Sequence, residues 1–187
     1  KFLVADMPFL STRLGQNHGV RAAGTLIAAG ADAVKIEGAD GNTGLISYLV
    51  ESGIPVMGHI GLTPQFYRAF GGYKIQGRSE AAAVKLLSDA RALEKAGCFA
   101  VVAECIPSQV TRTITGALGI PLIGIGAGGA ADGQVLVLHD LLGFTSFKPK
   151  FVRRYLDGST LVCNALNAYC ADVCTGNFPA EEEAFTK

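Results

Sequence analysis

The sequence has few charged residues, no net charge and no long apolar run. Charged residues make up 17% of the 187 residues, and 16 Lys and Arg balance 16 Asp and Glu. A weakly charged, balanced chain has no broad field that attracts nucleic acid or anionic lipid, so neither is expected as a partner. No apolar run approaches the ~20 residues that a membrane helix needs, so membrane insertion is not expected either. Nearly half of the residues, 49%, are hydrophobic, which is enough for a sizeable core and argues against disorder.

The five cysteines are odd in number and lack the regular spacing of a disulfide framework. This favours reduced thiols and a cytoplasmic location, or a mitochondrial one in a eukaryote. Cys163, Cys170 and Cys174 fall on one face of a helix by their spacing. A metal site there would want a fourth ligand, which the nearby sequence does not offer. We therefore expect these thiols to pack as small buried hydrophobes.

Short apolar runs alternate with helical patterns along the chain. Six runs are predicted as strands: 2–5, 33–36, 54–57, 98–103, 121–125 and 135–138. Four helices are predicted between them: 19–29, 45–51, 80–96 and 110–118. Ser79 is placed to cap the third helix and Gly97 to end it. Near-continuous apolarity is typical of strands covered on both faces, so the alternation predicts a parallel α/β sheet.

The number of strands bears on the architecture. An open doubly wound sheet can use six strands, whereas a closed (β/α)₈ TIM-type barrel needs eight and usually ~250 residues. Because Lys1 leads directly into an apolar run, we expect a barrel that lacks its first two β/α units. One barrel domain over residues 1–187 is expected, with a helical C-terminal segment at about 147–187, of which 151–175 packs on a neighbouring subunit.

Polar residues follow the predicted strands where the strands end. They are Asp6 after the first, Lys35 and Glu37 at the second, His59 at the third, Glu104 at the fourth, a GIGAG segment at the fifth and His139-Asp140 at the sixth. The carboxyl ends of parallel barrel strands meet on one face, where active sites lie. The pattern therefore predicts an active site built from these residues.

Asp6 and Glu37 end neighbouring strands, where two carboxylates repel each other unless a cation or a proton lies between them. Oxygen ligands without an adjacent thiol favour Mg²⁺ or Mn²⁺ over Zn²⁺. Salt bridges or helix caps are the alternative for each carboxylate. Lys35 shares the side of its strand with Glu37 and can pair with a substrate carboxylate, form a Schiff base, or make a structural ion pair.

Glu104 is a candidate general base, because a carboxylate in a partly dry pocket suits proton removal; a third metal ligand or a buried salt bridge is the alternative. His59 is a hydrogen-bonding partner, a proton shuttle or a core histidine. The long segment 58–78 carries glycines, aromatics and the bases Arg68, Lys74 and Arg78, which suits a lid over an aromatic or anionic substrate, or a subunit contact. The glycines after residue 123 leave no room for the helix of a dinucleotide site.

Several of these residues lie in motifs that together resemble the ketopantoate hydroxymethyltransferase family. The motifs are ADMPF (5–9), AVKIEG (33–38), GHIGLTPQ (58–65), GGYKIQGR (71–78), ECIP (104–107), IPLIGIGAG (120–128) and DGQVLVLHD (132–140). They occur in the family's order and cover essentially the whole chain. The resemblance implies a (β/α)₈ barrel in a homo-oligomer, commonly a decamer.

The resemblance also implies an activity, namely hydroxymethyl transfer from 5,10-methylenetetrahydrofolate to 3-methyl-2-oxobutanoate through a metal-stabilised enolate. It implies Mg²⁺ held by Asp6 and Glu37, substrate binding by Lys35, Asp6 and His59, and proton removal by Glu104. The family's further metal-shell Asp, in a VGDSLG-type stretch on an earlier strand, has no counterpart here. The alternatives are a Mg-dependent lyase of the phosphoenolpyruvate mutase and isocitrate lyase type, a non-catalytic truncated homologue, and a Schiff-base aldolase acting through Lys35.

Overall fold

The computed structural model describes residues 1–185, and the chain falls into two compact units, Lys1–Val135 and Leu136–Lys187. The boundary lies earlier than the helical C-terminal segment predicted from residue 147. Among the described residues, no helix combines the length and the apolar composition that crossing a bilayer requires. That both units belong to one barrel domain stays a prediction.

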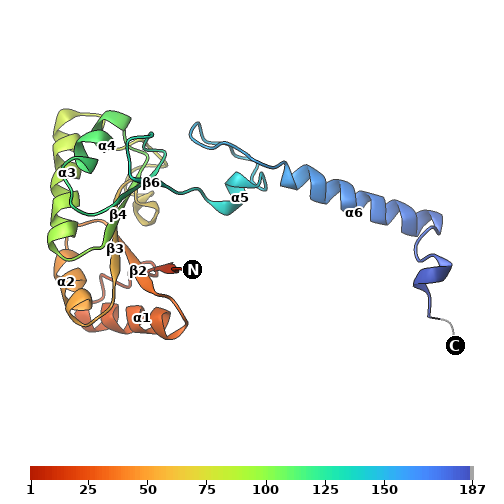
Figure 1. The fold of residues 1–187 in the computed structure, drawn as a ribbon, viewed down its shortest axis with the longest axis horizontal. Helices are drawn as coiled ribbons and strands as arrows, with labels where there is room; N and C mark the ends of the chain where they lie inside the picture. The colour runs from red at the N-terminus through yellow and green to blue at the C-terminus, as the bar shows by residue number, and fades with distance from the viewer. Residues whose placement is uncertain (186–187) are drawn as a thin grey trace. The chain divides into compact units, whose positions relative to one another are not determined.

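The first unit is built on a parallel sheet of six strands in the order β1-β2-β3-β4-β5-β6. The strands are β1 Val4–Asp6, β2 Ala33–Glu37, β3 Val56–Gly61, β4 Ala100–Glu104, β5 Leu122–Ile125 and β6 Gly133–Gln134. The intervening helices are α1 Gln16–Ala28, α2 Thr43–Glu51, α3 Glu80–Lys95 and α4 Ser108–Thr115, with a 3₁₀ turn η1 at Pro64–Phe66. Figure 1 shows these helices along one side of the sheet. The predicted α/β alternation and parallel pairing are confirmed.

The two faces of the sheet carry different chemistry. Side chains alternate along each strand, and residues paired across parallel strands point to the same side. One face brings apolar side chains against the helices, including those of Val34, Ile36, Val56, Val101, Ala103 and Leu122. The opposite face therefore carries the alternate residues of the same strands, Asp6, Lys35, Glu37, His59 and Glu104 among them.

The third helix shows how local sequence sets its ends. The Ser79 side chain accepts a hydrogen bond from the backbone N–H of Ala82, and Glu80 lies in the first turn. The Ser79 hydroxyl satisfies a backbone N–H that has no partner within the helix, and the negative charge of Glu80 interacts favourably with the positive end of the helix dipole. Gly97, with φ +96°, follows the helix. The predicted cap and end of this helix are confirmed.

The predicted strand at 135–138 is wrong. The sixth strand is only Gly133–Gln134, and its ladder with β5 ends where Val135 N donates to Gly124 O. The side chains of Val135, Val137 and Leu138 are about half exposed, at 44%, 52% and 62%. The apolar run indicated a buried strand, but in the described part of the chain strand pairing stops at its first residue. In consequence His139 and Asp140 lie on the short helix α5, Leu138–Leu141, in the second unit, and not at a strand end.

The second unit contains α5, the longer helix α6 at Gly158–Thr175, and the 3₁₀ turn η2 at Glu181–Glu183. The prediction that Cys163, Cys170 and Cys174 are buried is wrong for this unit, since all three are exposed on α6. Their spacing does place them on one face, but no other element of this unit covers that face. Helical spacing predicted which residues share a side, and not what lies against it.

Gly61 offers a test of the close contact between β3 and the end of β4. An added Cβ at Gly61 would lie 2.2 Å from the Glu104 carbonyl oxygen, whereas one at Gly53 meets no atom within 4 Å. The two glycines have nearly equal φ, +87° and +86°. We expect Gly53→Ala to lower the free energy of unfolding by about 1–2 kcal/mol for the left-handed backbone alone, and Gly61→Ala by roughly 1–3 kcal/mol more for the clash. Equal losses in urea unfolding would contradict this.

Thiol reactivity tests the placement of the cysteines. Burial raises the pKa of Cys98 to about 12, and burial together with the charge of Glu104 raises the pKa of Cys105 to about 11. We expect iodoacetamide at pH 8 to modify the exposed Cys163, Cys170 and Cys174 on the order of 100-fold faster than either, because the thiolate is the nucleophile. Mass spectrometry of peptides gives the rates. Protection of the three thiols in the folded, dissociated subunit, lost on denaturation, would contradict their exposure, whereas protection in the oligomer alone agrees with the expected packing of 151–175 on a neighbouring subunit.

Candidate active site

A line of charged and polar side chains crosses the first four strands at their carboxyl ends. Lys35 Nζ lies 3.0 Å from Asp6 Oδ1 and 3.4 Å from His59 Nδ1. His59 Nε2 lies 3.3 Å from Glu104 Oε2. The parallel register explains the line, since Asp6 pairs with Lys35 and Gly61 with Glu104, two positions beyond His59. Four of the residues predicted for the site therefore lie together.

His59 occupies the centre of this line and is 1% exposed. A lysine ammonium only donates hydrogen bonds, so Nδ1 of His59 accepts and Nε2 of the neutral ring carries the proton. That N–H is close to the Glu104 carboxylate but is not aligned with it as a hydrogen bond, and Nε2 has no other partner among the described residues. His59 thus places an uncommitted donor beside the candidate base.

Glu37 lies at the end of β2, and its carboxylate is held by a neighbouring loop. The backbone N–H of Gln65 donates to Glu37 Oε2 at 2.9 Å. Burial raises the pKa of Glu37 above its ordinary value, against the hydrogen bond from Gln65 and the Coulombic effects of His59 and Lys35, and Asp6 raises it further. The repulsion from Asp6 means that the two predicted metal-shell carboxylates are close enough to interact.

The residues present fit a partial magnesium shell. Two carboxylates supply hard oxygen ligands, and Mg²⁺ commonly binds one or two protein carboxylates while keeping several waters. Burial raises the pKa of Glu37 because it disfavours the negative charge of the carboxylate. A bound divalent cation would stabilise that charge. Among residues 1–185, no cluster of three or more His, Cys, Asp or Glu is arranged to hold a metal. The metal role of Asp6 and Glu37 stays a prediction.

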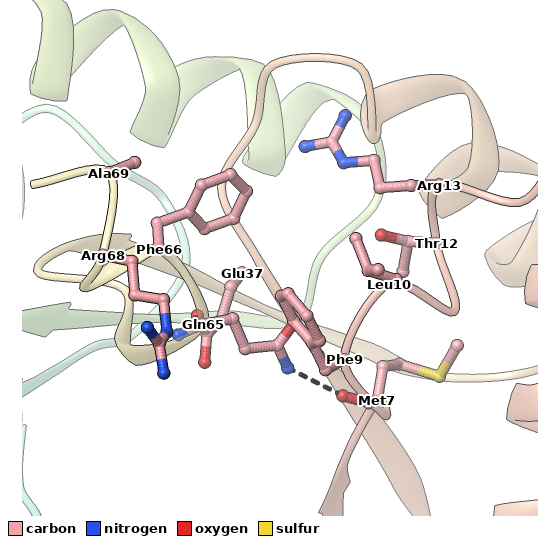
Figure 2. A pocket seen from close by; sticks show the side chains of 10 residues that line it. All are labelled: Met7, Phe9, Leu10, Thr12, Arg13, Glu37, Gln65, Phe66, Arg68 and Ala69. Atoms are coloured by element: carbon pink, nitrogen blue, oxygen red, sulfur yellow. Dashed lines mark hydrogen bonds between the residues drawn. The ribbon is translucent and has the colours of Figure 1, made fainter.

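A cavity of about 280 Å³ opens beside Glu37, between the loop after β1 and the loop after β3. Figure 2 shows Glu37 in the middle of its walls, with the side chain of Gln65 donating to the Met7 carbonyl oxygen. Gln65 therefore ties both loops to the end of β2. Its role was missed in the sequence, where only its place in a GHIGLTPQ motif marked it.

The segment 58–78 begins in β3 and is tied to the end of β4. Leu62 N donates to Glu104 O, and Gln76 N donates to Cys105 O. Both ends of the segment are therefore hydrogen-bonded to the backbone at the candidate base Glu104 and its neighbour. Of the three predicted basic residues, Arg68 lines the cavity at Glu37, whereas Lys74 and Arg78 do not. The prediction of a binding loop fits this placement for Arg68.

The glycine segment after β5 approaches neighbouring backbone. Gly128 has φ +78°, and an added Cβ would lie 2.5 Å from Ser108 Cβ at the start of α4. Between β5 and β6 the described chain contains no helix, in agreement with the argument against a dinucleotide site. His139 and Asp140 lie on the short helix α5 of the other unit.

Carboxylates, a lysine and a histidine gathered at the carboxyl ends of parallel strands define an α/β enzyme of the barrel type. The chain belongs to the ketopantoate hydroxymethyltransferase family, whose model matches residues 1–181. Curated relatives named 3-methyl-2-oxobutanoate hydroxymethyltransferase are similar throughout. The protein from Francisella tularensis subsp. novicida is 52% identical, and the match covers 99% of this chain and 70% of that protein. The protein from Bdellovibrio bacteriovorus is 53% identical, and the match covers 100% of this chain and 71% of that protein.

Solved structures of similar fold have other names. A phosphoenolpyruvate phosphomutase from Streptomyces platensis subsp. rosaceus matches with a TM-score of 0.53 and 16% identity, over 100% of this chain and 66% of that one. A phosphonopyruvate hydrolase matches with a TM-score of 0.53 and 14% identity, over 100% and 65%. At this identity the likeness shows the fold alone. The sheet of six parallel strands is thus of the kind found in barrel enzymes.

The raised pKa of Glu37 gives a testable pH dependence. The folded state binds the Glu37 proton more tightly than the unfolded state, so ionisation destabilises the fold as pH rises above the ordinary value of 4.5. We expect Glu37→Gln, without added divalent metal, to be more stable than the parent at pH 7, with a difference that shrinks below pH 4.5. Thermal unfolding across pH measures it. The exposed Glu51→Gln on α2 is the control, and a Glu37→Gln variant no more stable than this control would contradict the expectation.

Proposed function

We propose that the chain transfers a hydroxymethyl group from 5,10-methylenetetrahydrofolate to 3-methyl-2-oxobutanoate, giving ketopantoate for pantothenate biosynthesis. Membership of the family and the names of its relatives support the activity. The observation that carries the chemistry is the line Asp6–Lys35–His59–Glu104 across the carboxyl ends of four parallel strands. It combines a fixed cation with a carboxylate base on one face of the sheet.

Glu104 is the base that removes the proton next to the ketone, giving an enolate. Its carboxylate is mostly buried, with 15% of the side chain exposed, so little water competes for it. His59 Nε2 lies 3.3 Å from Oε2 without a hydrogen bond to it, so its N–H stays available as a donor beside the base. The methylene carbon then bonds to the enolate carbon and takes its hydroxyl group from one water, while its two bonds to folate nitrogens break. The remaining proton of the water and the proton taken up by Glu104 go to these nitrogens, which releases tetrahydrofolate.

Lys35 and Asp6 bind the oxo-acid. The Lys35 ammonium is 17% exposed and is oriented by Asp6 and by His59, so a substrate carboxylate meets a preorganised donor. Asp6 is largely exposed and can turn to another ligand at small cost. Asp6 and Glu37 would hold Mg²⁺, which when bound polarises the substrate carbonyl.

Lys35 acts as a charged donor here, and not as a Schiff-base nucleophile. A nucleophilic lysine must be neutral, and an apolar pocket or another cation favours that form. Lys35 instead forms an ion pair with the Asp6 carboxylate, with Nζ 3.0 Å from Oδ1. A lyase of the phosphoenolpyruvate mutase type shares only the fold with this chain.

Three further features belong to the proposal. The six parallel strands belong to a (β/α)₈ barrel, which the fold of the solved phosphoenolpyruvate phosphomutase supports. The chain forms a homo-oligomer, supported by the exposed apolar residues Leu161, Leu166 and Tyr169 on α6. The decameric number and the cytoplasmic location stay predictions.

Exchange of the C3 proton of 3-methyl-2-oxobutanoate in D₂O tests the proposed first step without folate. We expect NMR to show Mg²⁺-dependent exchange that falls at least about 100-fold in Glu104→Gln, because the general base is removed. Glu51→Gln, on the exposed side of α2, should exchange like the parent. No exchange by folded parent protein, or equal exchange by Glu104→Gln, would overturn the assignment.

A further inference from the structure

The cavity beside Glu37 has two walls that come from the loops flanking one strand. Because β1 and β3 both pair with β2, the loops that follow them rise on either side of the β2 end. Phe9, Leu10 and Arg13 come from the first loop, and Phe66 and Arg68 from the second (Figure 2). Glu37 is half-buried, whereas both arginines are exposed, so the cavity runs from the candidate site outward.

Three apolar side chains in the walls of the cavity are exposed to solvent. Phe9, Leu10 and Phe66 are 66%, 48% and 37% exposed. Leu10 also has φ +63°, and hydrogen bonds from Ser11 N to Pro8 O and from Arg13 N to Leu10 O hold the turn around it. Gathered exposed apolar side chains mark binding sites, and strained residues cluster at them. The wall is shaped for an apolar, flat ligand.

The solvent end of the cavity is positively charged. Arg13 donates to the Asp40 carbonyl oxygen and stacks over the Phe66 ring at 5.9 Å, and Arg68 stacks over Tyr67 at 5.4 Å. Neither guanidinium forms an ion pair with a carboxylate in the part of the chain that the structure describes. An arginine without an acidic partner keeps its donors for bidentate binding of a ligand carboxylate.

We propose that this cavity is the subsite for the folate co-substrate, with its ring system between Phe9 and Phe66 and a glutamate carboxylate on Arg68. The inference rests on the proposed function. The volume of about 280 Å³ suits a ring system whose tail extends into solvent. The apolar walls take the rings, and the inner end at Glu37 brings the carried carbon toward the oxo-acid.

Two ligands that differ only in the tail separate the roles of the residues. Calorimetry would compare tetrahydrofolate with tetrahydropteroate, which has the same rings but no glutamate. We expect Arg68→Ala to weaken tetrahydrofolate binding about tenfold, because one charge-assisted contact is lost, and to change tetrahydropteroate binding by less than about twofold. Phe9→Ala should weaken both ligands alike. Arg91→Ala, an exposed arginine on α3 that does not line the cavity, should change neither.

The subsite is overturned if Arg68→Ala binds tetrahydrofolate like Arg91→Ala, or if the parent protein binds no tetrahydrofolate. It is also overturned if Arg68→Ala weakens both ligands equally, since the carboxylate would then not be the group recognised. Proton exchange by the parent protein needs no folate and separates the two claims. Exchange without binding rejects the subsite alone, whereas binding without exchange rejects the proposed enolising site and leaves the subsite supported.

Discussion

The parallel pairing of β2 with both β1 and β3 fixes the position of each charged side chain in the candidate site. Lys35 stands opposite Asp6, and Glu37 stands opposite His59. Because side chains alternate with a period of two, a slip of one residue would turn Lys35 and Glu37 toward the helices. It would equally expose Val34, which is 0% exposed in the core. The same register therefore maintains both the hydrophobic core and the face that carries the candidate site.

Energetically unfavourable features, namely a partly buried carboxylate and strained backbone, lie around this face. Glu37 keeps a partly buried carboxylate with a raised pKa, and Leu10 and Cys105 are the non-glycine residues with positive φ among those described. Both lie just beyond strands that carry candidate site residues. The helix side of the sheet shows the opposite, with closely packed apolar residues. Proteins commonly place strain where function requires a particular geometry, and the rest of the fold supports it.

Local patterns predicted most of the first unit. The alternation of apolar runs and helices gave its parallel sheet, and Ser79 gave the start of α3, because caps and periodicity depend only on neighbouring residues. The strand predicted at 135–138 was wrong because that prediction also used only neighbouring residues. Apolarity indicates that a segment should be covered, but only a partner strand makes it a strand, and β6 ends at Gln134. The exposed thiols of α6 show the same limit.

The sequence by itself determined that Asp6, Lys35, His59 and Glu104 lie near the carboxyl ends of parallel strands, and that Lys35 and Glu37 share a side. This follows from the two-residue period of a strand and the direction of parallel pairing. Only the tertiary structure decided how the members meet. The buried His59 between Lys35 and Glu104 depends on which strands are neighbours. The link from Glu37 through Gln65 to Met7, and the cavity beside it, depends on how two loops distant in sequence lie beside one strand. Spacing along the chain carries no information about such contacts, because they form between segments that the fold brings together.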